Sequence, residues 1–140
     1  MRVIIGGAYN GKKEFVKKSL SHIDQNVIHF FDGEIPTTSF TKDDYVVISN
    51  FEEMILNMSE FEEDEIAKHL IEAILKLDSQ TNVYCICNDI GRGVVPIEKE
   101  QRKLRDTCGR LYQKLFEESK SIVRIWYGIP QIIKECHDHE

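Results

Sequence analysis

The 140-residue chain has no apolar run long enough to cross a membrane, no basic excess and no paired Cys-x-x-Cys motif. The first absence excludes a membrane-spanning helix. A net charge of −6 argues against general nucleic-acid binding through a basic surface. The four cysteines lack paired zinc-site spacing. We therefore expect no membrane span, no nucleic-acid partner and no metal site built from cysteines.

The cysteine pattern and the amino terminus indicate a compartment. Cys85 and Cys87 lie two positions apart, so they share one face of a strand and are expected as core thiols in a reducing environment. The start, residues 1–7, is too short for a signal peptide. We expect a cytoplasmic protein. With 41% hydrophobic and 30% charged residues, the chain is expected to form a single domain over residues 1–140.

Short apolar runs alternate with helical patterns along the chain. Five runs have the character of strands: Arg2–Gly6, Asn26–Phe31, Tyr45–Ser49, Val83–Cys87 and Ile122–Tyr127. This alternation predicts an α/β fold with a mainly parallel sheet and helices on both faces, in three layers. Ligands of such folds bind at the carboxyl ends of the strands.

A phosphate-binding motif follows the first predicted strand. Residues 6–12 read G-G-A-Y-N-G-K, which matches the G-x-x-x-x-G-K pattern in its required strand–loop–helix context. Glycines let backbone N–H groups turn toward phosphate, and the next helix offers its positive end. We expect Lys12 to act on the outer phosphates as the catalytic residue. The predicted nucleotide-binding residues are Gly6, Gly7, Ala8, Tyr9, Asn10, Gly11, Lys12 and Lys13.

Two positions depart from a magnesium-dependent phosphate loop. Lys13 stands where a Ser or Thr hydroxyl would ligate Mg²⁺. Ser49-Asn50 stands where a strand would end in an acidic residue. Glu52 and Glu53 follow at once and could substitute, or they are acidic residues favoured in the first turn of a helix. The pattern thus favours phosphate binding over unaided Mg²⁺ chemistry.

A strand, loop, helix and strand occupy the last third of the chain. The loop after Cys87 contains glycines that permit close approach to a ligand. We predict ligand contacts there from Asn88, Asp89, Gly91, Gly93 and Pro96. The alternative is an ordinary strand-to-helix connection.

The long helix that follows has two stripes. Leu104, Cys108, Leu111 and Leu115 form an apolar one. The second is rich in arginine, whose planar guanidinium suits phosphate or carboxylate, or it is a solvated face. Its members are Arg102, Arg105, Asp106, Gly109, Arg110 and Gln113, of which Arg105, Asp106 and Arg110 are predicted ligand contacts.

Together these residues resemble the adenosylcobinamide kinase / adenosylcobinamide-phosphate guanylyltransferase family of cobalamin biosynthesis. The family pattern N-E-V-G-x-G-I-V-P, then R-x-x-R-D-x-x-G-R-x-N-Q, is similar to residues 88–96 and 102–113. Gly128 and Lys134 match the family's glycine-ended strand and nearby lysine. Asp89 replaces the family glutamate, and Tyr112 replaces its asparagine.

The resemblance implies phosphorylation of adenosylcobinamide by GTP or ATP, followed by guanylyl transfer. It also implies a phosphate-loop nucleotide-binding fold and a homo-oligomer, in this family a trimer. The family places a GMP-accepting histidine on an insertion, but no histidine lies within Asp32–Asp44. His29 is expected to be structural. Two hypotheses stay open: a nucleotide-dependent transferase, or a nucleotide- or corrinoid-binding regulator or scaffold that has lost catalysis.

Overall fold

The computed structural model describes residues 1–7, 11–89 and 98–135. The strands are β1 (Arg2–Gly6), β2 (Ile28–Asp32), β3 (Tyr45–Ser49), β4 (Asn82–Asn88), β5 (Ser121–Trp126) and β6 (Ile129–Glu135). The α-helices are α1 (Lys12–Ser19), α2 (Phe51–Leu56), α3 (Glu63–Asp78) and α4 (Lys99–Glu118), and a 3₁₀ turn covers Gln25–Val27.

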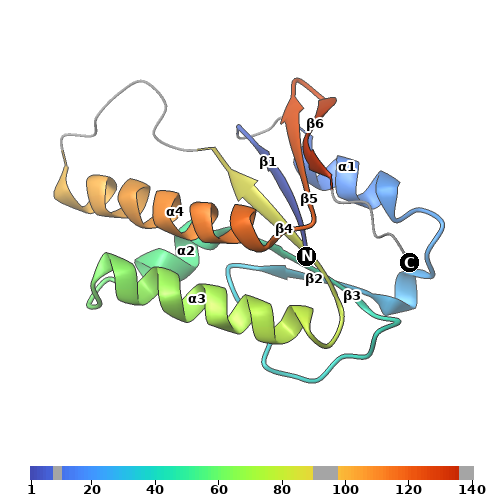
Figure 1. Cartoon of the computed structure of the whole chain (residues 1–140), viewed down its shortest axis with the longest axis horizontal. Coiled ribbons are helices and arrows are strands. Elements are labelled where there is room, and N and C mark those ends of the chain that lie inside the picture. Colours follow the sequence, from blue (N-terminus) through green and yellow to red (C-terminus); the bar gives the residue numbers. More distant parts are fainter. Residues whose placement is uncertain (8–10, 90–97, 136–140) are drawn as a thin grey trace.

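All six strands form one sheet in the order β2-β3-β4-β1-β5-β6. The first five run parallel, and β6 pairs antiparallel with β5 at one edge. Figure 1 shows α2, α3 and α4 on one face of the sheet and α1 on the other. The predicted fold class, a mainly parallel three-layer α/β structure, is confirmed.

The two faces bury cores of different size. The larger core lies under α2, α3 and α4, where the predicted stripes of α3 and α4 meet the sheet. Both helices face inward with residues spaced three or four positions apart: Ile66, Leu70, Ile74, Leu77, Cys108, Leu111 and Leu115 are all buried. The smaller core lies under α1 and centres on Val16 and Ile4.

The start of the second strand and one whole element differ from the sequence-based expectation. The second strand begins at Ile28, because residues 25–27 form a 3₁₀ turn capped by Asp24. The strand β6 was missed because its second residue is Pro130 and it is exposed along almost its whole length, so it shows no buried face. Proline is tolerated there since β6 is an edge strand.

The helices leave β1 and β4 toward opposite faces of the sheet. In the strand order, the connection that follows β1 leads toward β2, on one side of the sheet. The connection that follows β4 leads in the opposite direction, past β1 to β5. In parallel sheets a crevice for ligands forms at such a point, outside the carboxyl ends of the strands. The residues that follow Gly6 and Cys87 meet there.

Candidate functional site

The end of β1 is held tightly against β5. A Cβ built on Gly6 would lie 2.5 Å from the backbone oxygen of Ile125, so a larger residue would force the strands apart. The backbone N–H of Asp89 donates to the Gly6 oxygen at 2.8 Å. The start of the predicted phosphate loop and the start of the predicted ligand loop are therefore joined directly.

Lys12 is the first residue of α1 and is buried, with 6% of its surface exposed. Its ammonium donates to the backbone oxygen of Gly7. Burial lowers the pKa of Lys12, while the negative potential of Glu52 and Cys87 raises it. No described side chain caps the first turn of α1, so its N–H groups remain able to meet an anion. Of the predicted loop, Ala8, Tyr9 and Asn10 lie outside the described residues.

Glu52 lies beside Lys12 with one carboxylate oxygen unpaired. Its Oε2 accepts a hydrogen bond from Asn88 Nδ2 at 2.7 Å. Its Oε1 is buried and has no hydrogen-bond partner among the described residues. The hydroxyl of Tyr112 is also buried without a well-formed hydrogen bond, although the Cys108 thiol lies beside it, and burial raises the pKa of Tyr112. Buried polar atoms are normally paired, so these two offer hydrogen-bonding positions to a polar ligand group.

The capping of α2 decides which of the two glutamates turns inward. Asn50 adopts a left-handed conformation (φ 61°), and its side-chain oxygen accepts from the Glu53 backbone N–H at 3.4 Å. Asn50 Nδ2 donates to Glu53 Oε2 at 3.0 Å and to Asp32 Oδ1 at 2.9 Å. Glu53 is thus used in the cap, whereas Glu52 lies in the cluster with Lys12 and Asn88.

The ammonium of Lys13 lies over the ring of Phe30 on β2. Its Nζ is 5.5 Å from the ring centroid, and Lys17 Nζ is 6.0 Å from it. An ammonium over an aromatic face is attracted by the ring quadrupole. Lys13, which stands at the position of the usual magnesium ligand, is therefore held in a contact with another side chain of the protein.

The described residues contain no group of three or more His, Cys, Asp or Glu side chains arranged to hold a metal ion. Mg²⁺ in nucleotide sites is commonly held by one or two carboxylates together with substrate phosphates and water. Glu52 Oε1 fits one such position. The hydroxyl of Ser49, the last residue of β3, donates to the Phe31 oxygen at 3.4 Å and is therefore directed toward β2.

The arginine-rich face of α4 lines a cavity of about 660 Å³ that includes four of the predicted ligand contacts, Asp89, Arg105, Asp106 and Arg110. Three of these take part in ion pairs: Arg110 Nη2 lies 3.1 Å from Glu63 Oε2, and Arg105 Nη2 lies 3.1 Å from Asp106 Oδ1. Arg110 also contacts Asp64, so it ties α4 to α3. Gly91, Gly93 and Pro96 lie outside the described residues.

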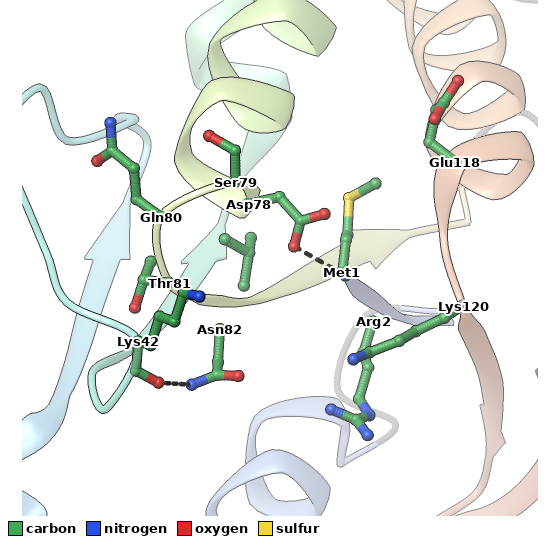
Figure 2. Close-up of a pocket in the computed structure, with 11 residues that line it drawn as sticks. Met1, Arg2, Lys42, Asp78, Ser79, Gln80, Thr81, Asn82, Glu118 and Lys120 are labelled. Carbon is green, nitrogen blue, oxygen red and sulfur yellow. Dashed lines mark hydrogen bonds and ion pairs between the residues drawn. The ribbon is translucent and has the colours of Figure 1, made fainter. Parts of the chain in front are cut away.

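A second cavity, of about 400 Å³, lies at the opposite end of the sheet (Figure 2). Its wall includes Asp78, which pairs with the amino group of Met1 at 2.8 Å, and Asn82, which donates to the Lys42 oxygen at 2.8 Å. None of the predicted site residues that the structure describes lines it. The polar groups of this cavity therefore serve the structure at the amino ends of the strands.

Residues of the β5–β6 hairpin join the phosphate-loop end of the site, and the sequence-based analysis missed them. Arg124, Trp126 and Tyr127 line a cavity of about 190 Å³ with Gly6, Gly7 and Asp89. A signal was present in the sequence, since the single tryptophan precedes a tyrosine and a glycine at the end of a predicted strand.

Comparison with known protein families shows to which family the chain belongs. A model of the family "cobinamide kinase / cobinamide phosphate guanyltransferase" matches residues 37–133, which is more than half of the chain. The chain belongs to this family. The family acts in cobalamin biosynthesis, and the resemblance carried by residues 88–96 and 102–113 is thereby confirmed.

The matched range runs from before β3 into β6, and it begins after the phosphate-loop motif. None of the curated proteins compared with the chain matches it significantly. Within the described ranges, no helix has the length and apolar character needed to cross a membrane.

Proposed function

We propose that this member of the family is a nucleoside-triphosphate-dependent cobinamide kinase. The observation that supports it best is the buried Lys12 at the start of α1, next to Glu52 with its unpaired oxygen. A charged residue is rarely buried without a partner or a function. In a loop that had lost its ligand, an apolar side chain at position 12 would avoid this desolvation.

In the proposed step, a hydroxyl oxygen of cobinamide attacks the γ-phosphorus of GTP or ATP. The bond from that phosphorus to the β–γ bridging oxygen breaks, the nucleoside diphosphate leaves, and the hydroxyl proton is released to water. Lys12 stabilises the negative charge on the transferred group. Mg²⁺, when bound with the nucleotide, would neutralise further phosphate charge. Glu52 would hold that cation or its water shell through Oε1.

Guanylyl transfer through a histidine is not part of this proposal. His29 Nε2 donates to Asp44 Oδ1 at 3.2 Å, and the centroid of its ring lies 5.0 Å from that of Phe40. It belongs to the amino-terminal part of β2, at the end of the sheet opposite to Gly6. No histidine occurs between Asp32 and Asp44. A phosphohistidine-type intermediate therefore has no residue to support it near Lys12 among those described.

The test is phosphoryl transfer from γ-labelled GTP and ATP to cobinamide, with Mg²⁺, by the full chain and by Glu52→Gln. Glutamine keeps the acceptor for Asn88 but removes the charge, so we expect the transfer rate to fall about 100-fold. The matched control is Glu65→Gln, an exposed residue on α3, which should retain the rate. Equal rates for Glu52→Gln and the unchanged chain would refute the assigned role of Glu52.

A nucleotide-binding protein without transferase activity is the second candidate. It is favoured by the contacts of Asn50 and Lys13 within the protein, because these residues stand at the two positions where a magnesium-dependent phosphate loop has its metal ligands. Nucleotide binding that is indifferent to Mg²⁺, together with no labelled product, would support this candidate over the kinase.

A further inference from the structure

The turn of the β5–β6 hairpin lies beside the phosphate loop. Both Figure 1 and the strand order place this turn at the same end of the sheet as the carboxyl end of β1. A Cβ built on Gly11, the residue before α1, would lie 3.8 Å from the Cα of Gly128. The backbone of the turn thus approaches Gly11 so closely that a β-carbon at that position would touch it.

The turn presents aromatic side chains to solvent at this place. Tyr127 is 79% exposed and Trp126 is 49% exposed. Their ring centroids are 6.0 Å apart at an interplanar angle of 70°, and the guanidinium of Arg124 lies 4.6 Å from the Trp126 centroid. Trp126 is therefore held between Arg124 and Tyr127, whereas most of the Tyr127 surface is open.

Tyr127 is an unfavourable residue for its backbone position. Trp126 pairs with Ile129, so Tyr127 and Gly128 form a two-residue turn, with φ values of 49° and 77°. Two positive φ values define a type I′ turn, in which Asn-Gly is strongly preferred. A bulky residue at positive φ is uncommon and carries strain. An exposed ring at a position that favours asparagine indicates a use for the ring itself.

We propose that Tyr127, positioned by Trp126 and Arg124, is the platform on which the nucleobase of the bound nucleotide stacks. The proposal rests on the proposed function, because it takes the phosphates to lie at Gly6–Lys12. Aromatic side chains stack on the faces of all bases, so the platform provides affinity for nucleosides rather than a choice between GTP and ATP. The cavity shared by Gly6, Gly7 and the hairpin connects the two subsites.

Trp126 is the single tryptophan of the chain, so its fluorescence reports directly on this platform. The full chain is titrated with GTP, ATP and inorganic tripolyphosphate, with emission and calorimetry measured together. We expect both nucleotides to change the Trp126 emission and to bind about tenfold more tightly than tripolyphosphate. Tripolyphosphate should bind and leave the emission nearly unchanged.

The decisive variant is Tyr127→Asn, which removes the ring and gives the turn its preferred residue. Its melting temperature should be retained or raised, its affinity for GTP and ATP should fall about tenfold, and its affinity for tripolyphosphate should not change. Tyr127→Phe should restore nucleotide affinity. Ile132→Asn, which removes an exposed apolar side chain from β6, is the matched control and should bind as the unchanged chain does.

Each other outcome overturns the proposal in a recognisable way. Unchanged nucleotide affinity in Tyr127→Asn excludes stacking on this ring. Equal losses for nucleotides and tripolyphosphate would assign Tyr127 to the phosphate site. A loss in Ile132→Asn as well, with a changed sedimentation coefficient, would assign the hairpin to contacts between copies. If neither nucleotides nor tripolyphosphate bind, the proposed function fails, and this inference fails with it.

Discussion

At the amino end of the sheet Asp44 is fully engaged, whereas at the carboxyl end Glu52 keeps an unpaired oxygen. The Asp44 carboxylate accepts from the Thr41 backbone and hydroxyl and contacts His29, and its backbone oxygen accepts from Thr81 and Asn82. These hydrogen bonds attach loops to strands, and they leave few free acceptor positions on Asp44 for a ligand.

The carboxyl end of the sheet also contains polar groups, but some of them lack a hydrogen-bond partner among the described residues. Glu52 Oε1 and the Tyr112 hydroxyl are buried and unpaired among the described residues, and the Lys12 ammonium has only a backbone oxygen as its hydrogen-bond partner in that set. Unsatisfied buried groups reduce stability. Among the described residues, the buried polar atoms without a partner thus lie at the carboxyl end of the sheet, the end to which the proposed function assigns the substrate.

The largest expected effect comes from Lys12→Met, which keeps the aliphatic length and removes the buried charge. Triphosphate affinity should fall at least about 100-fold, because a desolvated charge–phosphate contact is lost. The melting temperature should not fall, since burial already disfavours the ammonium. Calorimetric titration and thermal unfolding check both statements. Lys18→Met, on the exposed side of α1, is the control, and equal losses in both variants would contradict the role of Lys12.

Asp44→Ala should give the opposite pattern. Loss of its hydrogen bonds to Thr41 and His29 should lower the melting temperature by about 3–6 °C. Nucleotide affinity should stay unchanged, because Asp44 lies at the far end of the sheet. If this variant weakened nucleotide binding as much as it weakened the fold, the functional separation of the two ends would be wrong.

A smaller effect is expected from pH. Because the pKa of Lys12 in the free protein is lowered from 10.5, the folded chain loses that proton before the unfolded chain does. The penalty of burying the ammonium therefore disappears as pH rises through the lowered pKa, and stability relative to Lys12→Met should increase there. Over the same window triphosphate affinity should decrease. Urea unfolding of both proteins at several pH values between 7.5 and 10.5 tests the first statement, and a constant difference would contradict it.

The smallest effect concerns the thiols. Burial raises the pKa of both Cys85 and Cys108 to about 12, and it raises that of Cys87 as well. In native protein at pH 8 these three should not react with a thiol reagent, with or without nucleotide. Mass spectrometry of the alkylated protein locates any reaction. Modification of Cys87 alone would contradict this expectation and show that β4 opens near its carboxyl end while its centre, at Cys85, stays closed.

Sequence patterns predicted the elements that bury a regular face. The stripes ending at Leu77 and Leu115 repeat every three or four residues, so the periodicity alone defines α3 and α4. β6 has no such face, and its Pro130 argues against a strand in the absence of a known sheet edge. Edge position depends on the whole topology, which no local pattern contains.

The site was predictable in its motifs but not in its contacts. The phosphate loop and the possible use of Glu52 or Glu53 follow from spacing along the chain, and these assignments stay predictions. The choice between the two glutamates depends on the Asn50 cap. The pairing of Arg110 with Glu63 and Asp64 joins residues more than forty positions apart. Such long-range pairs arise only when α3 and α4 pack together.

The close fit of Gly6 against Ile125 has a consequence for how this protein can change over generations. Any side chain at position 6 would separate β1 from β5, and with them the loop that precedes α1 from the hairpin that carries Tyr127. The spacing between these two parts thus requires a residue without a β-carbon at position 6. As long as Gly6 is kept, the distance between the loop and the hairpin stays the same. Tyr127 or Glu52 can then be replaced singly without moving the rest of the site.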